Sequence, residues 1–183
     1  MIRFSRLFRS VGVGLAVAAA TLAMTQVAHA DLAPPNVPDA IKPPTGSQLF
    51  LVGHAKGVQK YTCDGVKWVL PSVPQADLID DAGNLIVTHF GGPTWKATDG
   101  SAVRGQLPPA GNVPSPAAGP AIPWLLLSTI PKVGAPVGLL TDTKIIQRLE
   151  TKGGTAPPTA ECKAQTSGKV KEVPYKADYF FWK

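Results

Sequence analysis

From Gln48 onward the chain consists of short apolar or alternating runs that are separated by Gly, Asp and Pro. Runs of this length with a period of two, bounded by turn residues, are typical of β-strands in an all-β protein. The clearest candidates are residues 58–63, 66–70, 77–80, 84–90, 124–129 and 175–182. We therefore expect an antiparallel β-barrel or sandwich of about eight to ten strands, built from hairpins.

Asp64-Gly65 predicts the first hairpin, because a two-residue turn needs the positive φ angles that Asp and Gly tolerate. This turn would pair residues 58–63 with residues 66–70 and place Cys63 opposite Val66. Apolar and polar side chains then separate onto two faces, which makes the register self-consistent. The face expected to be core consists of Tyr61, Cys63, Val66, Trp68 and Leu70.

Asp99-Gly100 predicts a second hairpin of the same kind. It would place Trp95 opposite Arg104, where the guanidinium could stack on the indole. Residues 143–152 are ambiguous. Ile145 and Leu149 would share a face of a short helix, whereas the β-branched pair Ile145-Ile146 favours a strand.

The first 30 residues have the three parts of a secretory signal peptide. Arg3, Arg6 and Arg9 precede an apolar run at 11–24, and Ala28-His29-Ala30 supplies small residues for cleavage. The apolar run is too short for a membrane span, which needs roughly 20 residues. We expect residues 1–30 to be removed, leaving a Pro-rich extended leader at 31–47, a single β domain at 48–183 and no membrane span.

Cleavage also changes the charge. The whole chain has 18 Lys and Arg against 12 Asp and Glu, and losing Arg3, Arg6 and Arg9 lowers the formal net charge from +6 to +3. The remaining basic residues are scattered along the sequence, whereas a nucleic-acid binder presents them in clusters. We therefore expect no nucleic-acid partner.

Cys63 and Cys162 are the two cysteines of the chain. In an oxidising compartment an even pair indicates a disulfide. The alternative is two free thiols or a metal-binding pair, although neither cysteine has the closely spaced partners of a zinc site. A disulfide closing about 100 residues stabilises by about 4–5 kcal/mol in the chain-entropy model. Together with the export signal, it predicts the periplasm or the extracellular medium.

Seven ordered segments carry a further resemblance: residues 57–63, 88–95 (THFGGPTW), 99–101, 121–127 (AIPWLLL), 146–148, 153–154 and the aromatic tail 173–182. Together they resemble DUF3455, a family of secreted bacterial and fungal proteins of unknown function. The chain departs from the family pattern near Ile145, where we expect an aromatic residue, and near Glu150, where we expect Asn. The resemblance implies a secreted single domain and supplies no catalytic residues.

Familiar catalytic motifs are absent from the sequence, which contains no G-x-S-x-G, GxxxxGK[ST] or H-E-x-x-H. His54 and His89 are the two histidines beyond the predicted signal peptide. With Asp77, Asp80 or Asp99 they could hold copper or zinc, since imidazole and carboxylate suit these ions. Their spacing is not diagnostic, and a hydrogen-bonded strand-end histidine is the competing explanation for His89.

The favoured binding surface consists of aromatic and polar side chains near the second hairpin. Trp95, Trp124 and Arg104, with His89 and Asp99 nearby, could form a platform for a sugar ring or a planar ligand. The alternative is that both tryptophans are core residues, and an exposed indole would distinguish the two.

We therefore expect a non-enzymatic binding module for a glycan, a small molecule or an envelope partner. The alternatives are a metal-dependent enzyme that uses His54 and His89, and a structural or stress-related surface protein without a specific ligand.

Overall fold

The computed structural model describes residues 36–107, 109–130 and 133–183, which belong to one compact unit, Leu32–Lys183. The predicted signal peptide and the first residues of the predicted leader lie outside this described part. Within it, no helix has the length and apolar character needed to cross a membrane.

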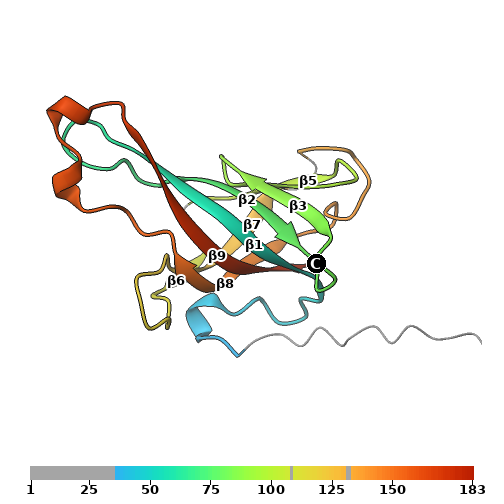
Figure 1. Ribbon diagram of the computed structural model, residues 1–183. Coiled ribbons are helices and arrows are strands. Elements are labelled where there is room, and N and C mark those ends of the chain that lie inside the picture. Colours follow the sequence, from blue (N-terminus) through green and yellow to red (C-terminus); the bar gives the residue numbers. More distant parts are fainter. Residues whose placement is uncertain (1–35, 108, 131–132) are drawn as a thin grey trace, which may run out of the picture. The chain divides into compact units, whose positions relative to one another are not determined.

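Nine strands of the described chain form one antiparallel sheet (Figure 1). Of three short 3-10 helices in the described residues, one precedes the first strand and two lie between the last two strands. In chain order the elements are η1 (Asp39–Ile41), β1 (Leu49–Thr62), β2 (Val73–Ile79), β3 (Leu85–Phe90), β4 (Thr94–Ala97), β5 (Ala102–Gly105), β6 (Gly111–Val113), β7 (Trp124–Ile130), β8 (Ile145–Gly153), η2 (Thr159–Glu161), η3 (Ala164–Thr166) and β9 (Val170–Trp182).

Eight of these strands close into a barrel. Their order is β5-β4-β3-β2-β1-β9-β8-β7, and β5 then pairs with β7 through Arg104↔Ile130 and Gly105↔Thr129. The short β6 lies beside the first part of β7, where Gly111 pairs with Leu126. The all-β class predicted from the sequence is confirmed, and of the two expected architectures the structure has the barrel.

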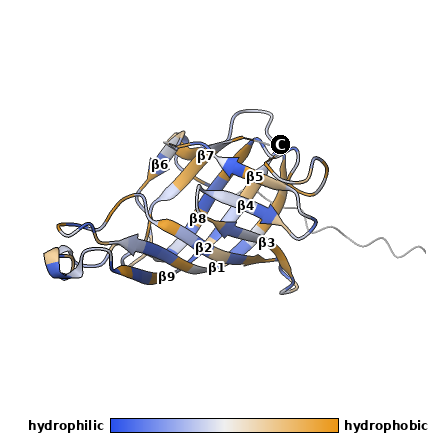
Figure 2. Cartoon of the chain, turned by 90° about the horizontal axis from the view of Figure 1, so that it is seen from above, coloured by the Kyte–Doolittle hydropathy of each residue, from blue (hydrophilic) through white to orange (hydrophobic). Residues whose placement is uncertain are grey.

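The barrel is filled by alternate residues of its strands, and Figure 2 shows hydrophobic and hydrophilic residues interspersed along them. Tyr175 and Tyr179 of β9 point into the core and lie opposite Gly57 and Gly53 of β1. A Cβ atom on Gly57 would collide with the backbone of Gln75 on β2. Glycine at this inward position therefore lets β1 approach β2 closely while a tyrosine occupies the adjacent space.

Strands β7, β8 and β9 also bury their outer faces. Residues 36–47 cover them, and Val37 and Ile41 are buried in this outer core. Gln147 of β8 connects this N-terminal segment to the sheet, because its Nε2 donates to Ile41 O at 2.7 Å and its Oε1 accepts from the Trp182 indole at 3.0 Å. The described part of the predicted leader thus contributes two side chains to the packed domain.

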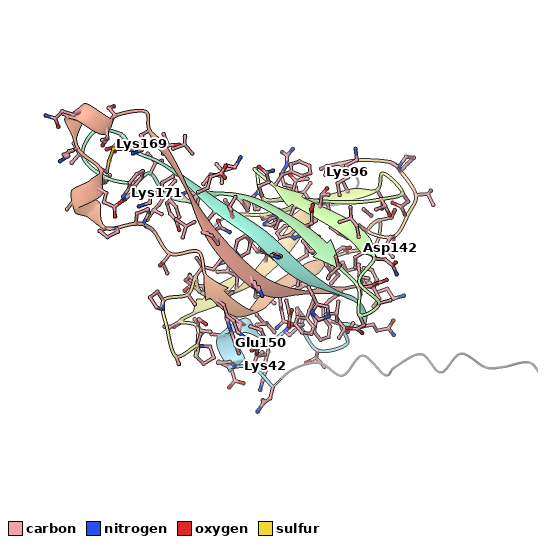
Figure 3. The ribbon with its side chains drawn as sticks, in the orientation of Figure 1. Lys42, Lys96, Asp142, Glu150, Lys169 and Lys171 are labelled. Atoms are coloured by element: carbon pink, nitrogen blue, oxygen red, sulfur yellow. A yellow bond between two sulfur atoms is a disulfide. The ribbon has the colours of Figure 1, made fainter. Side chains whose placement is uncertain are left out.

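Beyond the barrel, β1 and β9 continue as a two-stranded ribbon as far as the pair Thr62↔Val170 (Figure 1). The predicted disulfide between Cys63 and Cys162 is present at its far end, near Lys169, with a Cα–Cα distance of 5.4 Å (Figure 3). A small separate core surrounds it, formed with Tyr61, Trp68 and Val173.

The first predicted hairpin is wrong in register. Cys63 lies opposite Trp68 and not Val66, because the Asp64 amide donates to Lys67 O and the Asp64 carboxylate accepts from the Val66 and Lys67 amides. This longer loop leaves Val66 75% exposed. Residues 66–70, all described, form no extended strand, and β1 pairs instead with β2.

The second hairpin exists, but its loop has three residues and not two. The Ala97 amide donates to Ser101 O, and Gly100 alone takes a positive φ of 88°. This shift by one residue places Trp95 opposite Val103, with Arg104 on the other face of the sheet. The predicted stack of Arg104 on Trp95 is therefore wrong, because a one-residue change in register reverses the face of each side chain.

The ambiguous segment at 143–152 is a strand. It corresponds to β8, which lies between β7 and β9 and carries an irregularity at Glu150, whose φ is 49°. The strands predicted at 124–129 and 175–182 correspond to β7 and the inner part of β9.

Candidate ligand-binding cavity

A cavity of about 700 Å³ opens at the end of the barrel where β3 passes into β4. Its wall combines residues of β1, β2, β3, β4, β6, β7, β8 and β9 with the loop residues 70–72, 92–93, 107, 109 and 122–123. Most of its lining side chains are apolar. The polar and aromatic ones are Gln59, Tyr61, Ser72, His89, Trp95, Asn112, Arg148 and Tyr179.

Three buried aromatic rings form one part of this wall. The imidazole of His89 stacks on the indole of Trp95, with centroids 4.1 Å apart and planes within 8°. Tyr179 meets both rings edge-on, at 5.2 Å from His89 and 5.5 Å from Trp95. These residues come from β3, β4 and β9, so closure of the barrel assembles the cluster. Such packing holds the rings in fixed orientations.

His89 is held in its neutral form. Burial lowers the pKa of His89 to about 3, and the positive charge of Arg148 acts in the same direction. Its Nδ1 donates to the carbonyl oxygen of Thr94 at 2.9 Å. In a neutral imidazole the other nitrogen is an acceptor. Nε2 has no hydrogen-bond partner among the described residues, so His89 offers the cavity an acceptor.

Two of the residues that line the cavity carry buried donors without a partner. In the described part of the chain, five buried side-chain polar atoms lack a hydrogen bond, among them Gln59 Nε2 and Trp95 Nε1. The oxygen of the Gln59 amide is satisfied, because Ser72 Oγ donates to it at 2.7 Å. An unsatisfied buried donor destabilises a fold by about 1–3 kcal/mol, so each one needs an explanation.

Arg148 is the cation of the cavity. It lies at an inward position of β8, between the buried outward residues Gln147 and Leu149. Its Nε and Nη2 both donate to Pro123 O, at 3.1 and 2.8 Å. Across the described ranges Arg148 forms no ion pair, and the described lining includes no acidic side chain.

The structure brings together two of the five predicted ligand-binding residues, His89 and Trp95. Trp124 is buried in the outer core with Ile41. Asp99 stays in the second hairpin, where its carboxylate accepts from Ser101 and from the Leu139 amide. Arg104 is exposed on the outer face. Both tryptophans are buried, so the predicted platform with an exposed indole is not assembled.

The two histidines of the predicted metal site lie on opposite faces of the barrel wall. His54 points outward, where its Nδ1 and Nε2 contact Asp178 and Asp81 at 2.8 and 2.9 Å. The hydrogen bond to Asp178, and then that to Asp81, raises the pKa of His54. The described residues contain no group of three or more His, Cys, Asp or Glu side chains that could hold a metal. The structure therefore does not bring His54 and His89 together as ligands of one ion.

A family model matches most of the chain that forms this barrel. The model is DUF3455, described as a protein of unknown function, and it covers residues 43–183. The chain belongs to the DUF3455 family. The resemblance drawn from seven segments is confirmed, and the DUF3455 match includes every strand of the described sheet. No curated protein and no solved structure matches the chain.

Gln59, Arg148 and Tyr179 are among the cavity residues of this DUF3455 domain that were not predicted from its sequence. A signal existed for two of them. Gln59 lies two residues before Tyr61, so in a strand it shares the face that Tyr61 was predicted to direct into the core. Arg148 lies two residues after Ile146 in the segment 143–152, for which a strand was one of the two options. A polar residue at an inward position of a strand is a candidate for a site. Tyr179 stands among other aromatic residues and gave no such signal.

Proposed function

We propose that this DUF3455 domain is an exported, non-enzymatic module that binds a small molecule in the cavity of its barrel. The observation that carries this proposal is a mostly apolar cavity with the unpartnered donor Gln59 Nε2 in its wall. Small-molecule sites combine these two features, an apolar lining and a few placed polar groups. The volume of about 700 Å³ falls in the usual range for such sites.

The rim of the cavity supports the same function. Leu70, Val73 and Leu107 line the cavity and remain largely exposed to solvent. Exposed apolar side chains at the mouth of a cavity favour the transfer of an apolar ligand from water. Of the partners expected from the sequence, a small molecule suits this geometry better than a polymer surface, since the tryptophans expected to form a flat platform are buried.

The disulfide is compatible with export, because disulfides persist in oxidising compartments such as the periplasm and the extracellular medium. We propose that the binding activity operates in one of these two compartments.

Substituting Leu125 with tryptophan tests the site. Leu125 of β7 lines the cavity and is only partly buried, so a larger side chain there occupies ligand space. We expect the wild-type protein to bind the neutral fluorescent probe N-phenyl-1-naphthylamine saturably. Leu125→Trp should weaken this binding at least about tenfold, which corresponds to about 1.4 kcal/mol. Titration of probe fluorescence measures the effect.

Leu85→Trp is the matched control. Leu85 of β3 is 46% exposed and does not line the cavity, so this variant should bind the probe within about twofold of wild type, about 0.4 kcal/mol. Unfolding midpoints of both variants in urea establish that each is folded. Absence of saturable binding, or equal binding by the two variants, contradicts the proposal.

A further inference from the structure

We propose that the ligand of the cavity is an amphipathic organic monoanion, whose apolar body fills the barrel mouth and whose anionic group pairs with Arg148. This inference rests on the proposed function and names the class of ligand. It depends on the position of Arg148, on the donors beside it and on the absence of acidic groups from the described lining.

Arg148 has unused capacity to donate hydrogen bonds. A guanidinium carries five N–H donors in a planar fork. Two of its nitrogens, Nε and Nη2, donate to one carbonyl oxygen, that of Pro123. Nη1 forms no hydrogen bond within the described residues, and no carboxylate there neutralises the charge. A half-buried arginine held by a neutral group and lacking a counter-ion is suited to bind an anion from outside the chain.

Two further polar groups of the wall can donate to the same ligand. Gln59 Nε2 is a buried donor without a partner, and it belongs to the same wall as Arg148. Burial raises the pKa of the Tyr179 hydroxyl, which therefore keeps its proton. The Tyr175 hydroxyl lies 3.3 Å away and either group of the pair can donate, so when Tyr175 donates to Tyr179 the Tyr179 proton is available for a ligand oxygen. An anionic oxygen accepts such hydrogen bonds, and charge assistance roughly doubles their strength.

The chemistry of the lining also argues against a cationic ligand. None of the described lining residues is acidic, and a cation would lie near the charge of Arg148 without compensation. The anion must have an apolar body, because most of the surrounding surface consists of Leu, Ile, Val and Pro side chains. A strongly hydrated polyanion would lose its solvation against this surface without enough partners.

Two probes that differ in one group test the inference. 1-Anilinonaphthalene-8-sulfonate has the same body as N-phenyl-1-naphthylamine and adds one sulfonate. Using protein purified from cells expressing the full chain, we expect the sulfonate probe to bind about tenfold more tightly than the neutral one, as one charged hydrogen-bonded contact predicts. Arg148→Gln should remove this preference, so that the affinities of the two probes differ by less than about twofold in the variant.

Competition on the unmodified protein supplies a second measurement that does not depend on the folding of a variant. Decanoate should displace the neutral probe at about tenfold lower concentration than decanol. Equal affinities of the two naphthyl probes, or equal displacement by acid and alcohol, overturn the anionic ligand while leaving the proposed cavity function intact. Loss of all saturable binding, or binding that Leu125→Trp does not weaken, overturns both.

Discussion

Phe181→Ala should lower the free energy of unfolding by about 3–5 kcal/mol, the range for deleting a fully buried phenylalanine. Phe181 is fully buried in the barrel core, although it is the third residue from the end of the sequence. Its strand β9 pairs with β1 on one side, through Phe181↔Leu51, and with β8 on the other, through Phe181↔Ile146. A cavity at this position therefore weakens the strand that joins the two halves of the barrel.

Phe90→Ala is the matched control, because Phe90 is 41% exposed at the end of β3. We expect it to change the free energy of unfolding by less than about 1 kcal/mol, as surface substitutions usually do. Equilibrium unfolding in urea, followed by tryptophan fluorescence, gives both values. Equal losses of stability in the two variants would mean that the C-terminal strand does not complete the core.

Removal of the disulfide should have the second largest effect. The double variant Cys63→Ala/Cys162→Ala is expected to lose about 2–5 kcal/mol of unfolding free energy, since the bond constrains a long loop in the unfolded chain. The two cysteines are 99 positions apart, and the intervening chain includes β2 to β8. Denaturation curves of the double variant and of the wild-type protein provide the comparison.

The single variant Cys63→Ala separates the cross-link from packing. The alanine removes the bond and a buried sulfur together, and reduction of the wild-type protein removes the bond alone. We expect the Cys63→Ala variant and the reduced wild-type protein to lose a similar amount of unfolding free energy. A reduced wild-type protein as stable as the oxidised one would show that the cross-link contributes nothing and that packing around the ribbon accounts for the loss in the variants.

Much of the strand content could be predicted from the sequence, because short apolar or alternating runs bounded by turn residues are a local signal. The short apolar run at 124–129 and the aromatic run at 175–182 were both predicted as strands, and they correspond to β7 and the inner part of β9. Register could not be predicted equally well, since it depends on side-chain contacts within the loops. At Asp99 the carboxylate accepts from the Ser101 amide and hydroxyl and from the Leu139 amide, which fixes a three-residue loop.

The site was harder to predict than the fold because its residues come from distant parts of the chain. His89 and Trp95 lie close together in sequence and were identified together. Arg148 and Tyr179 reach the same cavity only through the pairing of β8 with β9, in which Arg148 lies opposite Tyr179. Sequence order gives no indication of that pairing. Arg104, which has the chemistry of Arg148, lies on the other face because of one residue in a turn.

The most direct test of the cavity as a binding site follows the indole N–H resonances of the four tryptophans during a titration with N-phenyl-1-naphthylamine. Trp95 lines the cavity and its N–H has no partner, whereas the N–H groups of Trp68 and Trp182 donate to Pro158 O and Gln147 Oε1. Trp124 is the internal control, because its N–H is also unpartnered but belongs to the outer core.

Single Trp→Phe variants assign the four resonances. Binding in the cavity predicts a saturable shift of the Trp95 resonance, while the Trp124, Trp68 and Trp182 resonances stay in place. An unmoved Trp95 resonance at saturating probe, or equal shifts of Trp95 and Trp124, would contradict a ligand site inside the barrel.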